Sequence, residues 1–410
     1  MNAIAAPLKH DARVIGLVAL AHGTSHFFQL ALPLLFPWIK EEFGVSYAEL
    51  GLCLTVFYAV SGVGQVLAGF LVDRVGGQRV LFSGMAVLVV AALGLAVSQN
   101  YLMLLLFSAL AGLGNCIFHP TDFALLNARV SQPRLGHAFS MHGISGNLGW
   151  AVAPLFLMPI AASAGWRAAL VAASVVVAAV LAVLWASRKS FDAGSVVVPA
   201  AALVPAGHAR APGTFGFMTL PVIWLCFAFF AVSAMTLGAM QSFATLSMRE
   251  LYGVTIAVAA SALSAYMLAG AVGMVIGGFV VARFRRYEAV IAVALASSAM
   301  FALLIAGSVL PGSLIVLLTA LLGVGVGIAG PSRDLLVRSV TPRGAAGRVY
   351  GVVYSGLDVG LATAPLLFGA LIDRHYPAAV FVGIACFQLL AILVAFGAGS
   401  GVLKAEARPA

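Results

Sequence analysis

The sequence predicts an all-α membrane protein of twelve transmembrane helices, arranged as two six-helix bundles. Of its 410 residues, 62% are hydrophobic and only 9% are charged, whereas a soluble domain carries about 25% charged residues. At roughly 20 residues per crossing plus short loops, the chain has room for about twelve spans. Prolines and glycines also recur at a fixed distance in its two halves. A water-soluble globule is therefore excluded, and the number of spans is typical of a transporter.

Hydropathy divides the chain into twelve apolar segments. The first six are expected at 14–38, 47–72, 78–98, 101–129, 137–162 and 166–187. The second six are expected at 217–246, 255–282, 287–308, 313–338, 347–372 and 377–400. Residues 188–216 are rich in Pro, Ala and Gly, which is typical of a flexible linker. We therefore expect an N-terminal bundle at 1–187, a cytoplasmic linker at 188–216 and a C-terminal bundle at 217–410.

Basic residues are distributed unevenly between the two sides. If the N-terminus lies inside, seventeen of the 22 Lys and Arg residues fall on the inner side, and the outer side holds only Lys40, Arg167, Arg249 and Arg374. Lys and Arg are retained preferentially in cytoplasmic loops, so both termini are expected in the cytoplasm. The net charge of +9 then reflects topology, and no nucleic-acid partner is expected.

The sequence contains no recognisable machinery for the commonest enzymatic reactions. It has no G-x-x-x-x-G-K-[ST], H-E-x-x-H or G-x-S-x-G motif, and its four cysteines have no C-x-x-C spacing. A solute sensor would need a long soluble output domain, which a linker of under 30 residues does not provide. We therefore expect no enzyme, no cofactor and no bound metal, and any active transport would run on an ion gradient.

The two halves of the chain share an internal repeat. Two prolines 34 residues apart recur at an offset of 211, as Pro120 and Pro154 in one half and Pro331 and Pro365 in the other. The same offset places Gly149 on Gly360. Two halves in the same orientation, related by an axis along the membrane normal, form a substrate site at their interface. This arrangement permits alternating access by rocking.

The loop after the second expected span carries a motif of glycines, one aspartate and two arginines. It reads Gly69-Phe-Leu-Val-Asp73-Arg74-Val-Gly76-Gly77-Gln-Arg79. This stretch resembles the G-x-x-x-D-R-x-G-x-[x]-R signature of the major facilitator superfamily, and the resemblance covers essentially the whole chain. It implies the major facilitator fold and secondary transport. An acid at a helix end with arginines beyond it can pair across the cytoplasmic gap and hold the outward-open state. Alternatively, these charges only end a span and fix its topology.

Two further stretches resemble the fosmidomycin-resistance branch of this superfamily. They are Gly112-Leu-Gly114-Asn-Cys-Ile-Phe118-His119-Pro120 and Gly146-Asn147-Leu-Gly149 followed by Pro154. The branch usually has Glu directly after the F-H-P proline, where this chain has Thr121 and then Asp122. It also usually has Gly before the span-five proline, where this chain has Ala153. The resemblance implies a proton-coupled exporter of drugs.

Ionisable residues inside a span are costly in hydrocarbon, so they normally face a cavity or a partner. His26 lies roughly 18 Å and Asp358 roughly 16 Å along its expected span, both near the middle of the bilayer. A low dielectric favours the neutral carboxyl, so Asp358 could load and release protons. We take Asp358, His26 and His22 as candidates for proton coupling. The alternatives are that Asp358 only binds backbone near glycines and that His26 is a packed histidine.

The remaining polar residues of the spans fall into two sets. The candidates for an inner gate lie near the cytoplasmic ends of spans: Asp73, Arg74, Arg79, His119, Asp122, Arg333 and Asp334. His119, Asp122, Arg333 and Asp334 could instead form an exit for protons or substrate. The candidates for the substrate cavity are Gln29, Tyr58, Gln65, His142, Asn147 and Tyr354.

The sequence thus predicts a multi-pass transporter of the bacterial inner (plasma) membrane. We expect it to move a small organic solute or drug outward in exchange for protons. The alternative is proton-coupled symport or facilitated uptake of a small organic anion. Histidines and Arg333 would suit an anion, whereas Asp122, Asp334 and Asp358 would suit a cation or a proton, so the charge of the cargo stays open. The expected partners are the solute, protons and the lipid bilayer, with the protein acting as a monomer.

Overall fold

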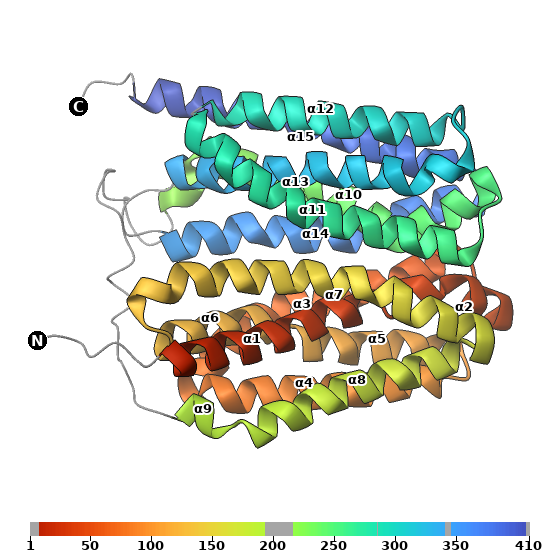
Figure 1. Cartoon of the computed structure of the whole chain (residues 1–410), viewed down its shortest axis with the longest axis horizontal. Coiled ribbons are helices and arrows are strands. Elements are labelled where there is room, and N and C mark those ends of the chain that lie inside the picture. Colours follow the sequence, from red (N-terminus) through yellow and green to blue (C-terminus); the bar gives the residue numbers. More distant parts are fainter. Residues whose placement is uncertain (1–7, 193–215, 285, 341–345, 407–410) are drawn as a thin grey trace, which may run out of the picture. The chain divides into compact units, whose positions relative to one another are not determined.

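The computed structural model describes residues 8–192, 216–284, 286–340 and 346–406, and these residues are almost entirely helical (Figure 1). Within this part of the chain, twelve helical segments are long and apolar enough to cross a membrane, which confirms the fold class expected from hydropathy. The chain separates into two compact units, Met1–Pro199 and Ala200–Ala410. Their boundary falls inside the expected linker, of which residues 193–215 lie outside the described residues.

Unit 1 holds the first six spans. Its helices are α1 (Leu8–Gln29), α2 (Phe36–Phe43), α3 (Tyr47–Val75), α4 (Gly77–Ala96), α5 (Tyr101–Asn115), α6 (Phe118–Arg129), α7 (Leu135–Ala164), α8 (Trp166–Ala186) and the short α9 (Lys189–Asp192). Helix α1 packs against α7, α3 packs against α5, and α4 packs against both α5 and α8.

Unit 2 holds the second six spans. Its helices are α10 (Pro221–Tyr252), α11 (Ile256–Arg283), α12 (Tyr287–Ala306), α13 (Ile315–Val340), α14 (Ala346–Asp373) and α15 (Ala378–Glu406). Helix α10 packs against α14, α11 packs against α13, and α12 packs against both α13 and α15. Span for span, these are the pairings of unit 1, so the repeat in the sequence is also a repeat of helix packing.

The repeat extends to the turn after the first span of each unit. Helix α2 is capped at its C-terminus by Gly44 and helix α10 by Gly253, with φ angles of 64° and 63°. Only glycine adopts this left-handed conformation without steric cost. The next helices are capped at their N-termini by Ser46 and Thr255, whose hydroxyls accept hydrogen bonds from backbone N–H groups in the first turn.

Two expected spans are interrupted. Helix α1 ends at Gln29, and the first span continues through the 3-10 turn Pro33–Leu35 into α2. The fourth span breaks after Asn115 and resumes at Phe118. Pro120 has no N–H to donate to the carbonyl four residues earlier, and its ring crowds that carbonyl, so a helix tends to break there. By contrast, α13 continues through the equivalent Pro331.

Glycines at the repeat positions let helix backbones touch. A Cβ placed on Gly149 of α7 would lie 2.0 Å from the carbonyl oxygen of Gly23 in α1. At the equivalent Gly360 of α14, a Cβ would lie 2.2 Å from the carbonyl oxygen of Ala231 in α10. Side chains do not fit at such distances, so these two glycines set how closely the first and fifth spans of each unit approach.

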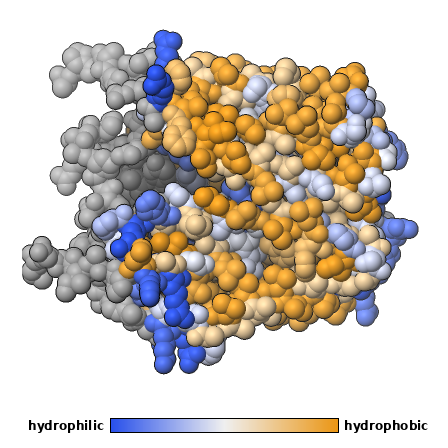
Figure 2. All heavy atoms as spheres, viewed as in Figure 1, coloured by the Kyte–Doolittle hydropathy of each residue, from blue (hydrophilic) through white to orange (hydrophobic). Residues whose placement is uncertain are grey.

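The surface is consistent with a lipid environment. Large apolar side chains are exposed on helices of both units, among them Val63 at 70%, Phe279 at 77% and Leu393 at 68%. Figure 2 shows hydrophobic residues over most of the described surface in view. Water-soluble proteins rarely expose so much apolar surface, whereas the hydrocarbon chains of a bilayer would cover it.

The close backbone contact at Gly149 predicts that a larger residue there lowers the free energy of unfolding. We expect Gly149→Ala to destabilise the protein by about 1–3 kcal/mol, because the new methyl group overpacks the contact between α1 and α7. The matched control is Gly143→Ala in the same helix, where a Cβ would meet nothing within 4 Å. The measurement is thermal unfolding of the detergent-solubilised protein. Equal melting temperatures for the two variants would contradict this account of the contact.

Candidate functional site

Unit 1 contains a cluster of five ionisable residues, here called the His–Asp cluster: His22, His26, His119, Asp122 and His142. Helix α1 supplies His22 and His26, α6 supplies His119 and Asp122, and α7 supplies His142. Spacings of four and three residues place the members from one helix on one face. Since α1 packs against both α6 and α7, the three helices bring these side chains together.

Asp122 lies at the centre of this cluster. Its Oδ2 atom is 3.1 Å from Nδ1 of His22 and 3.1 Å from Nε2 of His142. Asp122 is 0% exposed, His22 is 2% exposed and His142 is 6% exposed. The rings of His22 and His142 stack with their centroids 3.5 Å apart. The other carboxyl oxygen, Oδ1, is buried and has no hydrogen-bond partner among the described residues, so the carboxylate is only partly satisfied.

His119 connects the cluster to the surface of unit 1. Its ring centroid lies 5.4 Å from that of His22 and 6.0 Å from that of His142. Unlike those two histidines, His119 is exposed. A small cation or proton could therefore reach the buried residues by way of His119.

His26 links the cluster to a chain of polar side chains. Its ring centroid is 4.4 Å from that of His22 and 4.2 Å from that of Trp150. Trp150 donates its indole N–H to Gln29 at 3.0 Å, and Gln29 in turn donates to Asn115 at 3.3 Å. Asn115 donates to the hydroxyl of Ser61 at 2.9 Å. Polar groups from α1, α3, α5 and α7 thus form one network inside unit 1.

The Gly146-Asn147-Leu-Gly149 motif has a packing role beside this network. A Cβ on Gly146 would lie 2.6 Å from Nδ1 of His26, so only glycine leaves room for that ring. Gly149 provides the backbone contact with Gly23 one turn further along. Asn147 donates to the carbonyl of Gly143 in its own helix at 3.1 Å.

The polar residues of unit 2 are arranged around Arg333. Its Nε atom donates to Oδ1 of Asp334 at 2.9 Å, and its guanidinium lies 4.6 Å from the ring centroid of Phe230. The hydroxyl of Tyr354 makes a long contact of 3.5 Å with the same carboxylate oxygen of Asp334. Arg333 and Asp334, two residues predicted for the inner gate, are thus paired with each other.

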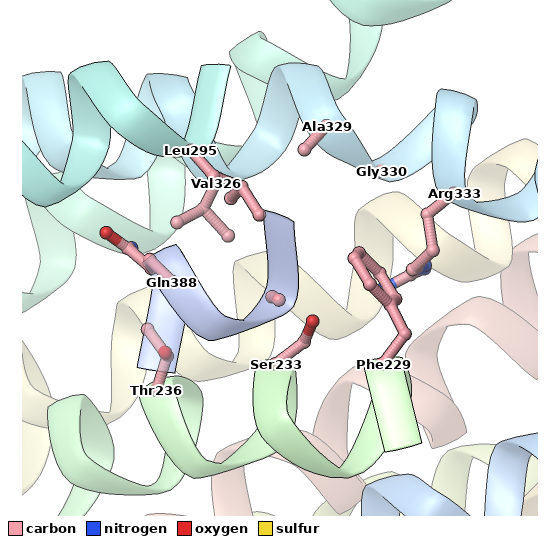
Figure 3. Close-up of a pocket in the computed structure, with 10 residues that line it drawn as sticks. Phe229, Ser233, Thr236, Leu295, Val326, Ala329, Gly330, Arg333 and Gln388 are labelled. Atoms are coloured by element: carbon pink, nitrogen blue, oxygen red, sulfur yellow. The ribbon is translucent and has the colours of Figure 1, made fainter. Parts of the chain in front are cut away.

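Arg333 also lines a small cavity in unit 2 (Figure 3). Its volume is about 40 Å³, which holds only a few water molecules. Two buried polar atoms of its lining, Oγ1 of Thr236 and the side-chain oxygen of Gln388, have no partner among the described residues. The cavity is therefore mainly apolar with a few polar groups, and it is too small for an organic solute in this conformation.

Asp358 lies half-buried in α14. Among the described residues, no hydrogen bond or ion pair involves its side chain. Tyr354, one turn before it, is 37% exposed and packs against Phe230 with a centroid distance of 4.6 Å. The two residues belong to one face of α14, as their spacing predicts.

The other candidates for the cavity and the gate differ in their burial. Tyr58 is buried and packs edge-on against Phe57, Gln65 is half-buried, and Arg74 and Arg79 are exposed. The side chain of Asp73 lies outside the described residues. The sequence assigned His22 and His26 to proton coupling, His142 to the cavity, and His119 and Asp122 to the gate, but in unit 1 they form one cluster.

One ion pair between a buried and a half-buried residue of unit 1 was not anticipated. Asp11, at 0% exposure near the start of α1, accepts hydrogen bonds from the backbone and hydroxyl of Ser131 and from the guanidinium of Arg134. These contacts tie α1 to the turn between α6 and α7, which are the three helices of the His–Asp cluster. From the sequence, Arg134 was only one of the seventeen basic residues counted on the inner side.

Comparison with known proteins identifies the family of the chain. The model of the Major Facilitator Superfamily matches residues 18–248 and 224–407. The uncharacterized MFS-type transporter YfnC of Bacillus subtilis (strain 168) is 27% identical over 411 residues, covering 95% of this chain and 96% of YfnC. The fosmidomycin resistance protein of Escherichia coli (strain K12) is 24% identical over 270 residues, covering 65% of this chain and 64% of that protein.

A solved structure shows the same fold. It is a bacterial homolog of the human lysosomal transporter Spinster in an inward-facing and unoccupied conformation, with a TM-score of 0.72, 15% identity and 97% coverage of both chains. Together with the twelve spans, these matches confirm the resemblance found in the sequence. The chain therefore belongs to the major facilitator superfamily and is a multi-pass transporter of the bacterial inner (plasma) membrane.

Proposed function

We propose that the protein exports a small organic solute or drug by alternating access, in exchange for protons. The observation that carries this proposal is the buried carboxylate of Asp122, which contacts two imidazoles and leaves one oxygen without a partner. Ionisable groups inside membrane spans commonly belong to proton relays. Histidine is the side chain whose charge changes most readily near physiological pH, so this cluster suits reversible proton binding.

The arrangement of the cluster supports a route for protons. His119 is exposed, whereas His22, His142 and Asp122 lie behind it at low exposure. A proton taken up at His119 could pass to the imidazoles on either side of Asp122. We orient this route with His119 toward the cytoplasm, in keeping with the distribution of basic residues.

Asp358 is a second candidate for proton coupling, in unit 2. Its carboxyl is half-buried without a partner in the described chain, so protonation would break no ion pair there. Its repeat mate at an offset of 211 is Asn147, which binds its own helix backbone. One unit thus offers a titratable group where the other offers a neutral amide.

The gate candidates that lie outside the His–Asp cluster keep their role in this proposal. Asp73, Arg74 and Arg79 stand where α3 passes into α4, and Arg333 and Asp334 form a pair in α13. We assign these residues to a cytoplasmic gate that opens and closes during transport. Efflux as the direction is supported by the similarity to the fosmidomycin resistance protein, whose name denotes protection against a drug.

One observation favours the alternative of anion uptake by symport or facilitated diffusion. Arg333 lines a cavity that also holds polar atoms of Thr236 and Gln388 without partners among the described residues. A guanidinium recognises carboxylates and phosphonates well. If this cavity enlarges when the transporter changes conformation, it would suit an anionic solute.

The first prediction concerns coupling. In proteoliposomes that hold a candidate solute and the purified protein, we expect an imposed pH gradient to drive the solute against its own gradient, with protons moving the opposite way. The measurement is solute flux together with the internal pH. Solute and protons moving in the same direction would replace antiport by symport, and flux that ignores the gradient would leave facilitated diffusion.

The second prediction concerns Asp122. We expect Asp122→Asn to reduce gradient-driven transport at least tenfold while solute exchange without a gradient persists, because an amide cannot carry a proton between the two imidazoles. The matched control is Asp373→Asn, the same chemical change at the end of α14. Full gradient-driven transport by Asp122→Asn would remove the His–Asp cluster from the coupling mechanism.

The third prediction concerns Asp358 in the same assay. If this carboxyl couples transport to protons, Asp358→Asn should abolish accumulation against a gradient and spare counterflow exchange, again with Asp373→Asn as the control. Unchanged accumulation by Asp358→Asn would confine coupling to unit 1. Loss of both accumulation and exchange would instead indicate that Asp358 contributes to solute binding or folding.

A further inference from the structure

Three imidazoles of the His–Asp cluster are placed as metal ligands commonly are. His22, His119 and His142 each offer a ring nitrogen, and these nitrogens all lie within 4.8 Å of one another. The residues come from three different helices, α1, α6 and α7. Two of them are buried and one is exposed, which gives a protected site with an entry.

We propose that His22, His119 and His142 form a binding site for one divalent transition-metal ion of the zinc class, with Asp122 as its positioning residue. Imidazole nitrogen is a preferred ligand of zinc, cobalt, nickel and copper ions. Three histidines with one open position form a common zinc coordination set. The site was not expected from the sequence, because its ligands lie far apart in the chain and follow no local motif.

The distances are compatible with such a site once the rings reorient, because the stacked planes of His22 and His142 would have to tilt so that both lone pairs meet at one ion. Zinc–nitrogen bonds of about 2.0–2.1 Å in tetrahedral geometry place ligand nitrogens about 3.3 Å apart. The ring nitrogens, within 4.8 Å of each other, would therefore have to approach by at most about 1.5 Å. His119 is exposed and so has the most freedom to rotate toward the two buried rings.

Asp122 is placed to orient two of these ligands. Its Oδ2 atom contacts Nδ1 of His22 and Nε2 of His142, each at 3.1 Å. Metal-bound histidines usually donate their second ring N–H to a carboxylate or carbonyl, which fixes the ring and strengthens the ligand. Each ring has a second nitrogen besides the one that contacts Asp122, and this second nitrogen would be the ligand.

A second observation points to a missing positive charge. Oδ1 of Asp122 is buried without a hydrogen-bond partner in the described chain, and Asp122 itself is 0% exposed. A buried carboxylate is stable only with compensation from donors or cations. No Lys or Arg is paired with Asp122 in the described residues. A divalent cation among the three imidazoles would provide that compensation.

Metal binding does not rest on the proposed function, because it requires neither solute nor a pH gradient. The test uses the full chain purified without a polyhistidine tag, treated with a chelator and then dialysed. Cobalt(II) is titrated and followed by its visible absorption, and zinc is titrated by calorimetry in competition with cobalt. We expect one ion per chain, with a cobalt spectrum typical of nitrogen ligands and loss of that spectrum when zinc is added.

Single-residue variants distinguish the proposed metal ligands from a histidine outside the cluster. His119→Asn should weaken metal binding at least 100-fold, and its exposed position makes misfolding a small risk. Asp122→Asn should weaken binding by about 10- to 100-fold, because it removes the residue that orients the ligands. The control is His137→Asn, which removes an exposed histidine of α7 outside the cluster and should leave binding unchanged. Thermal unfolding without metal confirms that each variant is folded.

Either of two results would overturn the inference. One is the lack of stoichiometric cobalt or zinc binding by the unmodified chain, and the other is equal binding by the unmodified chain and His119→Asn. Both would leave the proton-exchange proposal standing, since that proposal is tested by solute flux. Conversely, flux that ignores the pH gradient, together with intact metal binding, would remove proton coupling and keep the metal site.

Discussion

The backbone contact between α1 and α7 is the interaction on which the candidate site depends. Gly149 lets the two helices meet at the carbonyl of Gly23, the residue next to His22. Only at this separation can the rings of His22 and His142 stack at 3.5 Å and share the carboxylate of Asp122. Inside a bilayer no water can replace these contacts, so the same packing that stabilises unit 1 also gives one oxygen of the buried carboxylate its two partners.

Unit 2 repeats this contact but carries different chemistry on it. Gly360 meets the carbonyl of Ala231 as Gly149 meets that of Gly23. The residue before Ala231 is Phe230, and the repeat mate of Asp122 is Arg333, whose guanidinium lies 4.6 Å from the Phe230 ring. In both units, a charged residue of the fourth span thus contacts a ring of the first span. The helix contact is thus the same in both units, whereas the charge beside it is negative at Asp122 and positive at Arg333.

The spans and the repeat could be predicted from the sequence, because they depend on local patterns of residues. The His–Asp cluster could not, because it depends on how helices cross. Apolar segments with basic residues at their ends predicted the twelve spans, and equally spaced prolines predicted the repeat. Depth along a straight span separated His26 from His119, but helices that cross bring residues of different nominal depth together. His22 and Asp122 are 100 residues apart, and no spacing rule links them. The ion pair of Asp11 and Arg134 was missed for the same reason, since these residues lie 123 positions apart.

The chemistry of imidazole connects proton exchange with metal binding at the His–Asp cluster. A histidine binds a metal ion through its neutral form, whereas it transfers a proton by passing through its charged form. One ring cannot do both at once, so an ion held by His22, His119 and His142 would remove these rings from any proton route. Occupancy by a metal and passage of protons through Asp122 are therefore mutually exclusive states of one site. Which state prevails would depend on pH and on the metal concentration at the exposed His119.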